Sequence, residues 1–96
     1  MLERLTREDL LPYVGNKFRL STEDQPIFEI ELHAVEAVGG TPNQREPFSA
    51  LFLAPAEPFL QQAIYTLEHE SIGPLTLFLV PLGPFQDGMK YEAVFT

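Results

Sequence analysis

The chain has 96 residues, 45% of them hydrophobic and 21% charged, with 14 Asp and Glu against six Lys and Arg and a formal net charge of −8. This length fits one domain with a single core, and the apolar content is enough for the chain to fold unaided. The acidic balance would repel a phosphate backbone or an anionic membrane surface, so we expect neither nucleic acid nor a membrane as a partner. Cysteine is absent from the sequence, which excludes disulfides and thiolate chemistry. We therefore expect one domain over residues 1–96.

The first residues of the chain and the length of its longest apolar run indicate where in the cell the protein is expected. Acids occupy positions 3, 8 and 9, where a secretory signal peptide would have a basic start followed by an apolar run. The longest apolar run, residues 77–82, is far shorter than the roughly 20 residues of a membrane-spanning helix. These features predict a cytoplasmic protein.

A short helix is predicted near the N-terminus. The Thr6 hydroxyl can accept a hydrogen bond from the Asp9 amide and so cap a helix, and the acids that follow Thr6 suit the positive end of the helix dipole. Pro12 disfavours helical geometry in the residue before it, and Gly15 is a natural stop. We expect one or two helical turns that plug or cap another element.

From residue 17 onward, apolar residues recur with a period of two, which is typical of β-strands. Six strands are predicted, at residues 17–21, 28–33, 48–54, 64–69, 75–82 and 89–95. Most connections are short, so strands adjacent in sequence are expected to pair antiparallel. The longest connection, residues 39–47, contains two Gly and two Pro and is expected to be a mobile loop.

This pattern predicts an all-β fold with one short N-terminal helix. Six short antiparallel strands form either a small barrel or a strongly curved sheet, and the sequence leaves that choice open.

Two of the predicted strands are apolar on both faces. Residues 75–82 are expected to form a central strand that is covered on both sides. In residues 48–54, Ser49 is the only polar side chain. A core of this size cannot easily cover both faces of two strands.

The uncovered apolar side chains suggest an interface. We predict that Leu51, Leu53 and Phe78 are buried against a second copy of the chain or against another protein, because contiguous apolar patches usually mark interfaces. The alternative is that the N-terminal helix and residues 55–62 cover the second face within the monomer.

Glu29, Glu31 and His33 are the best candidates for a metal site. Alternate residues of a strand point the same way, so two carboxylates and an imidazole would form one row. Glu and His are also ordinary occupants of the solvent-facing side of an amphipathic strand, and we favour that interpretation. The sequence has no phosphate-binding glycine motif, and we expect no metal or organic cofactor.

No catalytic residue is assigned. His69 lies between two glutamates, but strand alternation turns it to the opposite side, and a histidine satisfied by a backbone carbonyl is favoured over a catalytic base. Ser49 lacks the Gly-x-Ser-x-Gly elbow of a serine nucleophile.

Several short segments occur in a specific order and spacing, and they are spread along nearly the whole chain. They are residues 5–10, 14–18, 45–49, 65–69, 77–81 and 87–95. On these segments the chain resembles a family of short uncharacterised bacterial proteins. That family has no established activity, so the resemblance implies no catalytic or binding residue. The resemblance implies that the gene of this protein lies beside genes of phage-tail-collar-like proteins, and hence that the protein has an assembly or accessory role.

These observations rank three functions. The leading hypothesis is a non-catalytic protein-interaction or assembly module, whose partner is another protein or a second copy. The alternative is a small β-barrel that binds an apolar ligand, although six-stranded barrels are usually filled by their own side chains. An enzyme comes third.

Overall fold

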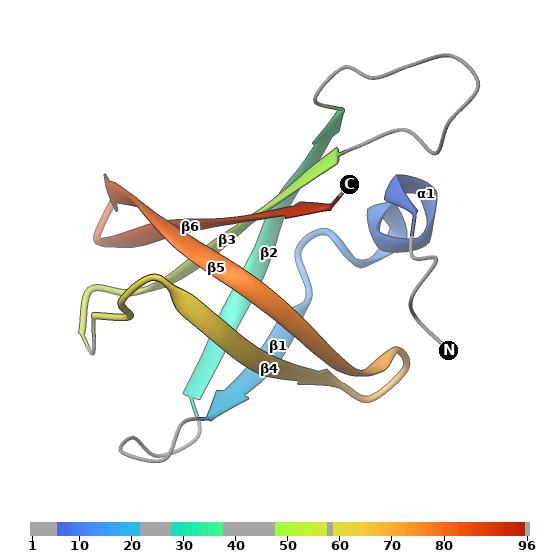
Figure 1. Ribbon diagram of the computed structural model, residues 1–96, viewed down its shortest axis with the longest axis horizontal. Helices are drawn as coiled ribbons and strands as arrows, with labels where there is room; N and C mark the ends of the chain where they lie inside the picture. Colours follow the sequence, from blue (N-terminus) through green and yellow to red (C-terminus); the bar gives the residue numbers. More distant parts are fainter. Residues whose placement is uncertain (1–5, 22–27, 38–47, 58, 96) are drawn as a thin grey trace.

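The computed structural model describes residues 6–21, 28–37, 48–57 and 59–95, and it shows a closed antiparallel barrel (Figure 1). A short helix precedes the strands: α1 (Arg7–Leu10) runs directly into the 3₁₀ turn η1 (Leu11–Tyr13). The strands are β1 (Lys17–Ser21), β2 (Phe28–Ala37), β3 (Phe48–Pro55), β4 (Ala63–His69), β5 (Gly73–Phe85) and β6 (Gly88–Phe95). The predicted all-β class and short N-terminal helix are confirmed, and the open choice is settled in favour of a barrel.

The order of strands around the barrel corrects one expectation. The order is β1-β2-β3-β6-β5-β4, so β3 pairs with β6 and β4 pairs with β1, although β3 and β4 are adjacent in sequence. The strands β4-β1-β2-β3 form a Greek key, in which the fourth strand returns to lie beside the first. Since β3 and β4 lie three places apart in a ring of six, the chain between them has to cross from one side of the barrel to the other.

This crossing segment enters the core. Leu60 is buried, and its backbone N–H donates to the Tyr91 hydroxyl at 2.9 Å. Tyr91 is itself fully buried on β6, so the bond satisfies a hydroxyl that the barrel interior would otherwise leave unpaired. The crossing segment thereby adds an apolar side chain to the core.

The N-terminal helix begins as its sequence predicts. Thr6 accepts a hydrogen bond from the Asp9 amide, and the Asp9 carboxylate accepts one from the Thr6 amide, which completes a capping box. Leu10 is fully buried in the core cluster. Figure 1 shows α1 and the β3–β4 connection at opposite sides of the barrel, so each adds one leucine to the core from its own side. Neither helical segment in the described residues has the length and apolarity that crossing a membrane requires.

Aromatic and aliphatic side chains fill the interior. The largest fully buried side chains are Tyr91, Phe18, Phe48 and Phe52, and the Phe18 and Phe52 rings meet edge to face with centroids 5.8 Å apart. The core cluster draws on all six strands. A barrel of this size is filled by its own side chains.

The expectation of a central strand covered on both sides is wrong. In β5, Leu75, Leu77 and Leu79 are buried, whereas Thr76 and Phe78 between them are exposed. A closed barrel has no central strand, because every strand has two neighbours, one inner face and one outer face. The strand is also longer than predicted.

β5 continues past its predicted end at residue 82 as far as Phe85. The register shifts between Pro81 and Gly83, and Gly83 adopts a φ of 137°, which side chains disfavour. The sequence Gly83-Pro84, which the sequence pattern assigns to a turn, is instead part of a bulged strand end. The predicted mobile loop at residues 39–47 lies outside the described residues.

Gly88 offers a test of the packing between β3 and β6. It is the partner of Pro55, and a Cβ at this position would collide with the backbone carbonyl oxygen of Ala54. We expect Gly88→Ala to lower the free energy of unfolding by about 1–3 kcal/mol, because a backbone atom cannot yield as a flexible side chain can. Urea denaturation measures this change.

The control is Val94→Ala on the same strand, where the side chain is exposed and the expected change is within about 0.5 kcal/mol. Equal stability of Gly88→Ala and the unsubstituted chain would contradict the close approach.

Candidate functional site

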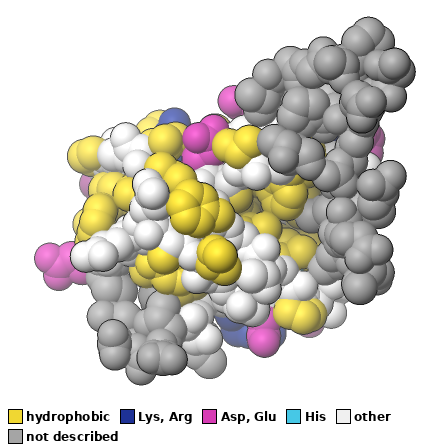
Figure 2. All heavy atoms as spheres, in the orientation of Figure 1, with side chains coloured by type: hydrophobic (Ala, Val, Ile, Leu, Met, Phe, Trp, Pro, Cys, Tyr) yellow, Lys and Arg dark blue, Asp and Glu magenta, His cyan; other side chains and the backbone are white. Residues whose placement is uncertain are grey.

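The outer surface of the barrel carries an apolar patch, which we define as Ile64 and Phe78. Ile64 and Phe78 are direct cross-strand partners on β4 and β5, with 67% and 49% of their surface exposed. Val94 is 54% exposed on the neighbouring strand β6. Figure 2, in the same orientation as Figure 1, shows hydrophobic side chains grouped on the face that β5 crosses. Three adjoining strands therefore expose large apolar side chains on the outer surface.

The predicted interface residues divide between different environments. Phe78 belongs to the apolar patch, but Leu51 is only 8% exposed and is buried by the chain itself. Leu51 lies between Ala34 on β2 and Glu92 on β6. Leu53 is half-buried and lines a groove. Leu51 is therefore buried within the monomer between β2 and β6, whereas the N-terminal helix and residues 55–62 add Leu10 and Leu60 to the core cluster.

Ile64 and Val94 were missed by sequence reasoning. Ile64 alternates with Thr66 and Glu68, both of which are exposed. An apolar residue in the solvent-facing register of an amphipathic strand was the pattern that could have indicated it.

An open groove of about 340 Å³ lies on the outside of the barrel. Its lining comes from β1, β2, the end of β3 and the β5–β6 hairpin: Lys17, Glu29, Glu31, Leu53, Ala54, Pro55, Phe85, Gln86, Asp87 and Gly88. The strand register explains why these residues meet, because Glu31 is the partner of Lys17 on one side and of Leu53 on the other. Half-buried apolar side chains and exposed charged ones thus line the same groove.

Phe85 links the groove to the neighbouring surface. The Lys90 ammonium lies 4.6 Å from the centroid of the Phe85 ring, within the range of a cation–π contact. The His33 ring packs against the same phenyl group, with centroids 5.4 Å apart. Residues 83–88 connect two of the predicted strands, and their sequence gave no indication that Phe85 would lie on a charged outer surface.

The predicted metal row lies along β2 beside the groove. Glu29 and Glu31 line the groove, and the exposed His33, which falls at a register shift between β2 and β3, packs its ring against Phe85. Among the residues that the structure describes, no three His, Asp or Glu side chains are grouped as a metal would require. The structure therefore places the two glutamates in the groove lining and the histidine against Phe85.

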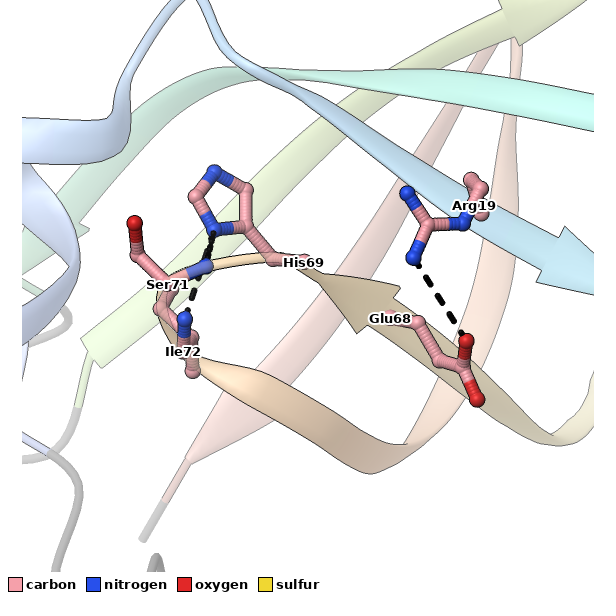
Figure 3. Close-up of polar contacts among 5 residues, drawn as sticks. All are labelled: Arg19, Glu68, His69, Ser71 and Ile72. Atoms are coloured by element: carbon pink, nitrogen blue, oxygen red, sulfur yellow. Dashed lines mark hydrogen bonds and ion pairs between the residues drawn. The ribbon is translucent and has the colours of Figure 1, made fainter.

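His69 is a buried structural residue. Its Nδ1 accepts hydrogen bonds from the backbone amides of Ser71 at 3.0 Å and Ile72 at 3.4 Å (Figure 3). Because Nδ1 accepts, the ring proton lies on Nε2, which donates to Asn16 Oδ1 at 3.0 Å. The backbone groups that bond to His69 are amides, whereas the sequence favoured a backbone carbonyl as its partner.

Glu68, the residue before His69, points to the other side of the strand and pairs with Arg19 at 3.6 Å (Figure 3). Strand alternation therefore separates the imidazole from this carboxylate, as expected. Ser49 is also buried, and its hydroxyl donates to the Glu92 carboxylate. Neither His69 nor Ser49 has the exposure that a catalytic group needs to reach a substrate.

A family model described as a domain of unknown function, DUF6916, matches residues 5–95. The chain belongs to this DUF6916 family. The match confirms the resemblance to an uncharacterised family, and it covers every strand of the barrel. No curated protein and no solved structure matches the chain. DUF6916 membership assigns no activity, so the functional argument depends on the two surfaces described above.

The role of His69 can be tested by substitution. His69→Leu removes the acceptor of two backbone amides, and we expect the free energy of unfolding to fall by about 1–3 kcal/mol. His69→Asn keeps an oxygen close to the position of Nδ1, so it should lose less stability than His69→Leu. Thermal denaturation of both variants provides the comparison, and an equal loss would contradict the proposed hydrogen-bonding role.

Proposed function

We propose that the protein is a non-catalytic interaction or assembly module that binds another protein chain, or a second copy of itself, through the apolar patch. The observation that carries this proposal is the exposed cross-strand pair of Ile64 and Phe78. Fully burying a side chain of this size contributes about 1.5–3 kcal/mol, and the exposed 67% of Ile64 and 49% of Phe78 are the part that a partner can still cover. Two such side chains side by side form the kind of patch that marks an interface.

The pattern of neighbouring side chains supports the same conclusion. Thr66 and Thr76 are cross-strand partners on the same outer face, and their hydroxyls lie 3.5 Å apart. A polar pair therefore adjoins the apolar pair, which matches the arrangement of an interface with an apolar centre and a polar rim.

The interior argues against the apolar-ligand alternative. Phe18, Phe52 and Tyr91 are fully buried, and the Tyr91 hydroxyl is already paired with the Leu60 amide. A ligand would have to displace side chains that pack against one another and break that bond. An interaction on the outside of the barrel requires neither change.

The resemblance and the composition suggest where this module acts. We propose a cytoplasmic setting. We also propose a bacterial origin and an accessory role beside a phage-tail-like assembly, which the resemblance implies. Assembly proteins act by binding other chains, and an exposed apolar patch suits that work.

Site-specific photo-cross-linking tests the proposal directly. With p-benzoylphenylalanine in place of Phe78, irradiation of cells of the source organism should give one discrete protein adduct that mass spectrometry identifies. The same group in place of Glu70, an exposed residue of the β4–β5 turn, is the control and should not give that adduct. An adduct of equal yield from both positions, or none from position 78, would refute the apolar patch as an interface.

Charge substitutions give a second test on the purified pair. Ile64→Lys and Phe78→Lys should leave the melting temperature nearly unchanged because both side chains are exposed, and should weaken binding to the cross-linked partner more than tenfold. Leu82→Lys is the matched control, since Leu82 is 51% exposed on β5 but outside the patch. Unchanged binding by the two patch variants would argue against the proposal.

A further inference from the structure

We propose that the groove binds a basic segment of a partner polypeptide. In this arrangement an arginine or lysine side chain of the partner lies among Glu29, Glu31 and Asp87, and adjoining apolar atoms of the segment contact Leu53 and Phe85. This inference goes beyond the proposed function, because it concerns a different surface and names the chemistry of its occupant.

The groove and the apolar patch lie on different sides of the barrel. In the ring of strands, β2 is three places from β5, and β3 is three places from β4. The groove is lined mainly by β2 and β3 with the tip of the β5–β6 hairpin, whereas Ile64 and Phe78 lie on β4 and β5. Occupation of one surface therefore leaves the other accessible.

The charges of the groove favour a cation. Its lining contains three carboxylates, from Glu29, Glu31 and Asp87, and one ammonium group, from Lys17. Among the described residues, the ion pairs join Arg7 to Glu8 and Arg19 to Glu68, and neither uses a carboxylate of the groove. Lys17 lies opposite Glu31 in the strand register and offsets one of the three negative charges, and Lys90, whose ammonium lies over Phe85 at the edge of the groove, offsets a second. The balance that remains is negative and complements a basic side chain.

The apolar lining favours a cation carried by a side chain over a free ion. Leu53 is half-buried between Glu31 and Lys90, its partners on the two neighbouring strands. Phe85 contributes apolar area to the groove, and the Lys90 ammonium already lies over its ring. The methylene groups of lysine or arginine suit such a surface, because their stems pack on apolar atoms while their heads stay charged.

Size and overall charge agree with a peptide segment. A volume of about 340 Å³ is at the lower end of the range of ligand pockets, roughly 300–1,000 Å³, and suits one side chain with its flanking backbone. The net charge of −8 attracts a basic partner over a longer range and speeds its association. A divalent ion fits less well, because the described residues hold no cluster of three metal-binding side chains.

Nuclear magnetic resonance with short peptides tests this inference. The probe is an acetylated and amidated Ala-Leu-Arg-Leu-Ala peptide, and its matched control replaces arginine with citrulline, which has the same shape and no charge. In spectra of the ¹⁵N-labelled full chain, we expect the arginine peptide to shift the amides of Glu31, Leu53 and residues 85–88. The citrulline peptide should bind about tenfold more weakly, which is the effect of losing one charge-assisted contact.

Substitutions assign the effect to the groove. Glu31→Gln and Asp87→Asn should each weaken binding of the arginine peptide severalfold, and Lys17→Gln should strengthen it, because the lining then loses a competing cation. Glu36→Gln is the matched control, since Glu36 is exposed on β2 but outside the groove lining, and it should leave binding unchanged.

Several results would overturn the inference. They are equal binding of the citrulline peptide, no shifts at millimolar peptide, shifts that map to Ile64 and Phe78, the same shifts with calcium or magnesium chloride alone, or shifts that appear on concentrating the chain by itself. The last two would indicate a metal ion or a second copy as the occupant. Cross-linking at position 78 is independent of these results, so the groove can fail while the proposed function stands.

Discussion

The pairing of β1 with β4 is the constraint on which the rest of the structure depends. It joins Leu20 to Leu67 and Arg19 to Glu68, and it turns a sheet with two free edges into a closed ring. Both leucines are fully buried, whereas the Arg19 and Glu68 side chains are each at least half exposed, so their ion pair contributes only about 0–1 kcal/mol. Closure is therefore stabilised mainly by apolar contacts, and both proposed binding surfaces lie on the outside of the barrel.

Closure also explains why two outer surfaces differ in chemistry. The chain crosses from β3 to β4 and adds Leu60 to the interior, while the N-terminal helix adds Leu10. Because both segments help to fill the core, exposed side chains on the outer face can differ in chemistry without a loss of core packing. One side carries the apolar pair of Ile64 and Phe78, and the side of β2 and β3 carries a groove with three carboxylates. The two proposals therefore assign a different partner to each surface.

The sequence predicted local structure far better than long-range pairing. The strand positions and the Thr6 cap follow from period-two alternation and hydrogen-bonding chemistry, which act over a few residues. The β1–β4 and β3–β6 pairs could not be predicted, because nothing local specifies which distant strand becomes a neighbour. The same limit applies to the candidate sites: His33 packs against Phe85 of β5, and Leu51 is buried between β2 and β6. The exposure of Phe78 on the outer face of β5 follows from strand alternation alone.

The central claim is that the protein binds on the outside of a filled barrel. Methyl spectra of a chain labelled at isoleucine, leucine and valine, recorded with and without a saturating medium-chain fatty acid, test it most directly. Ile30 and Leu79 report on the interior. Because the interior is already filled, their methyl resonances are predicted to keep their positions when the fatty acid is added. Movement of the two interior residues would contradict the central claim and show that the barrel takes an apolar ligand inside.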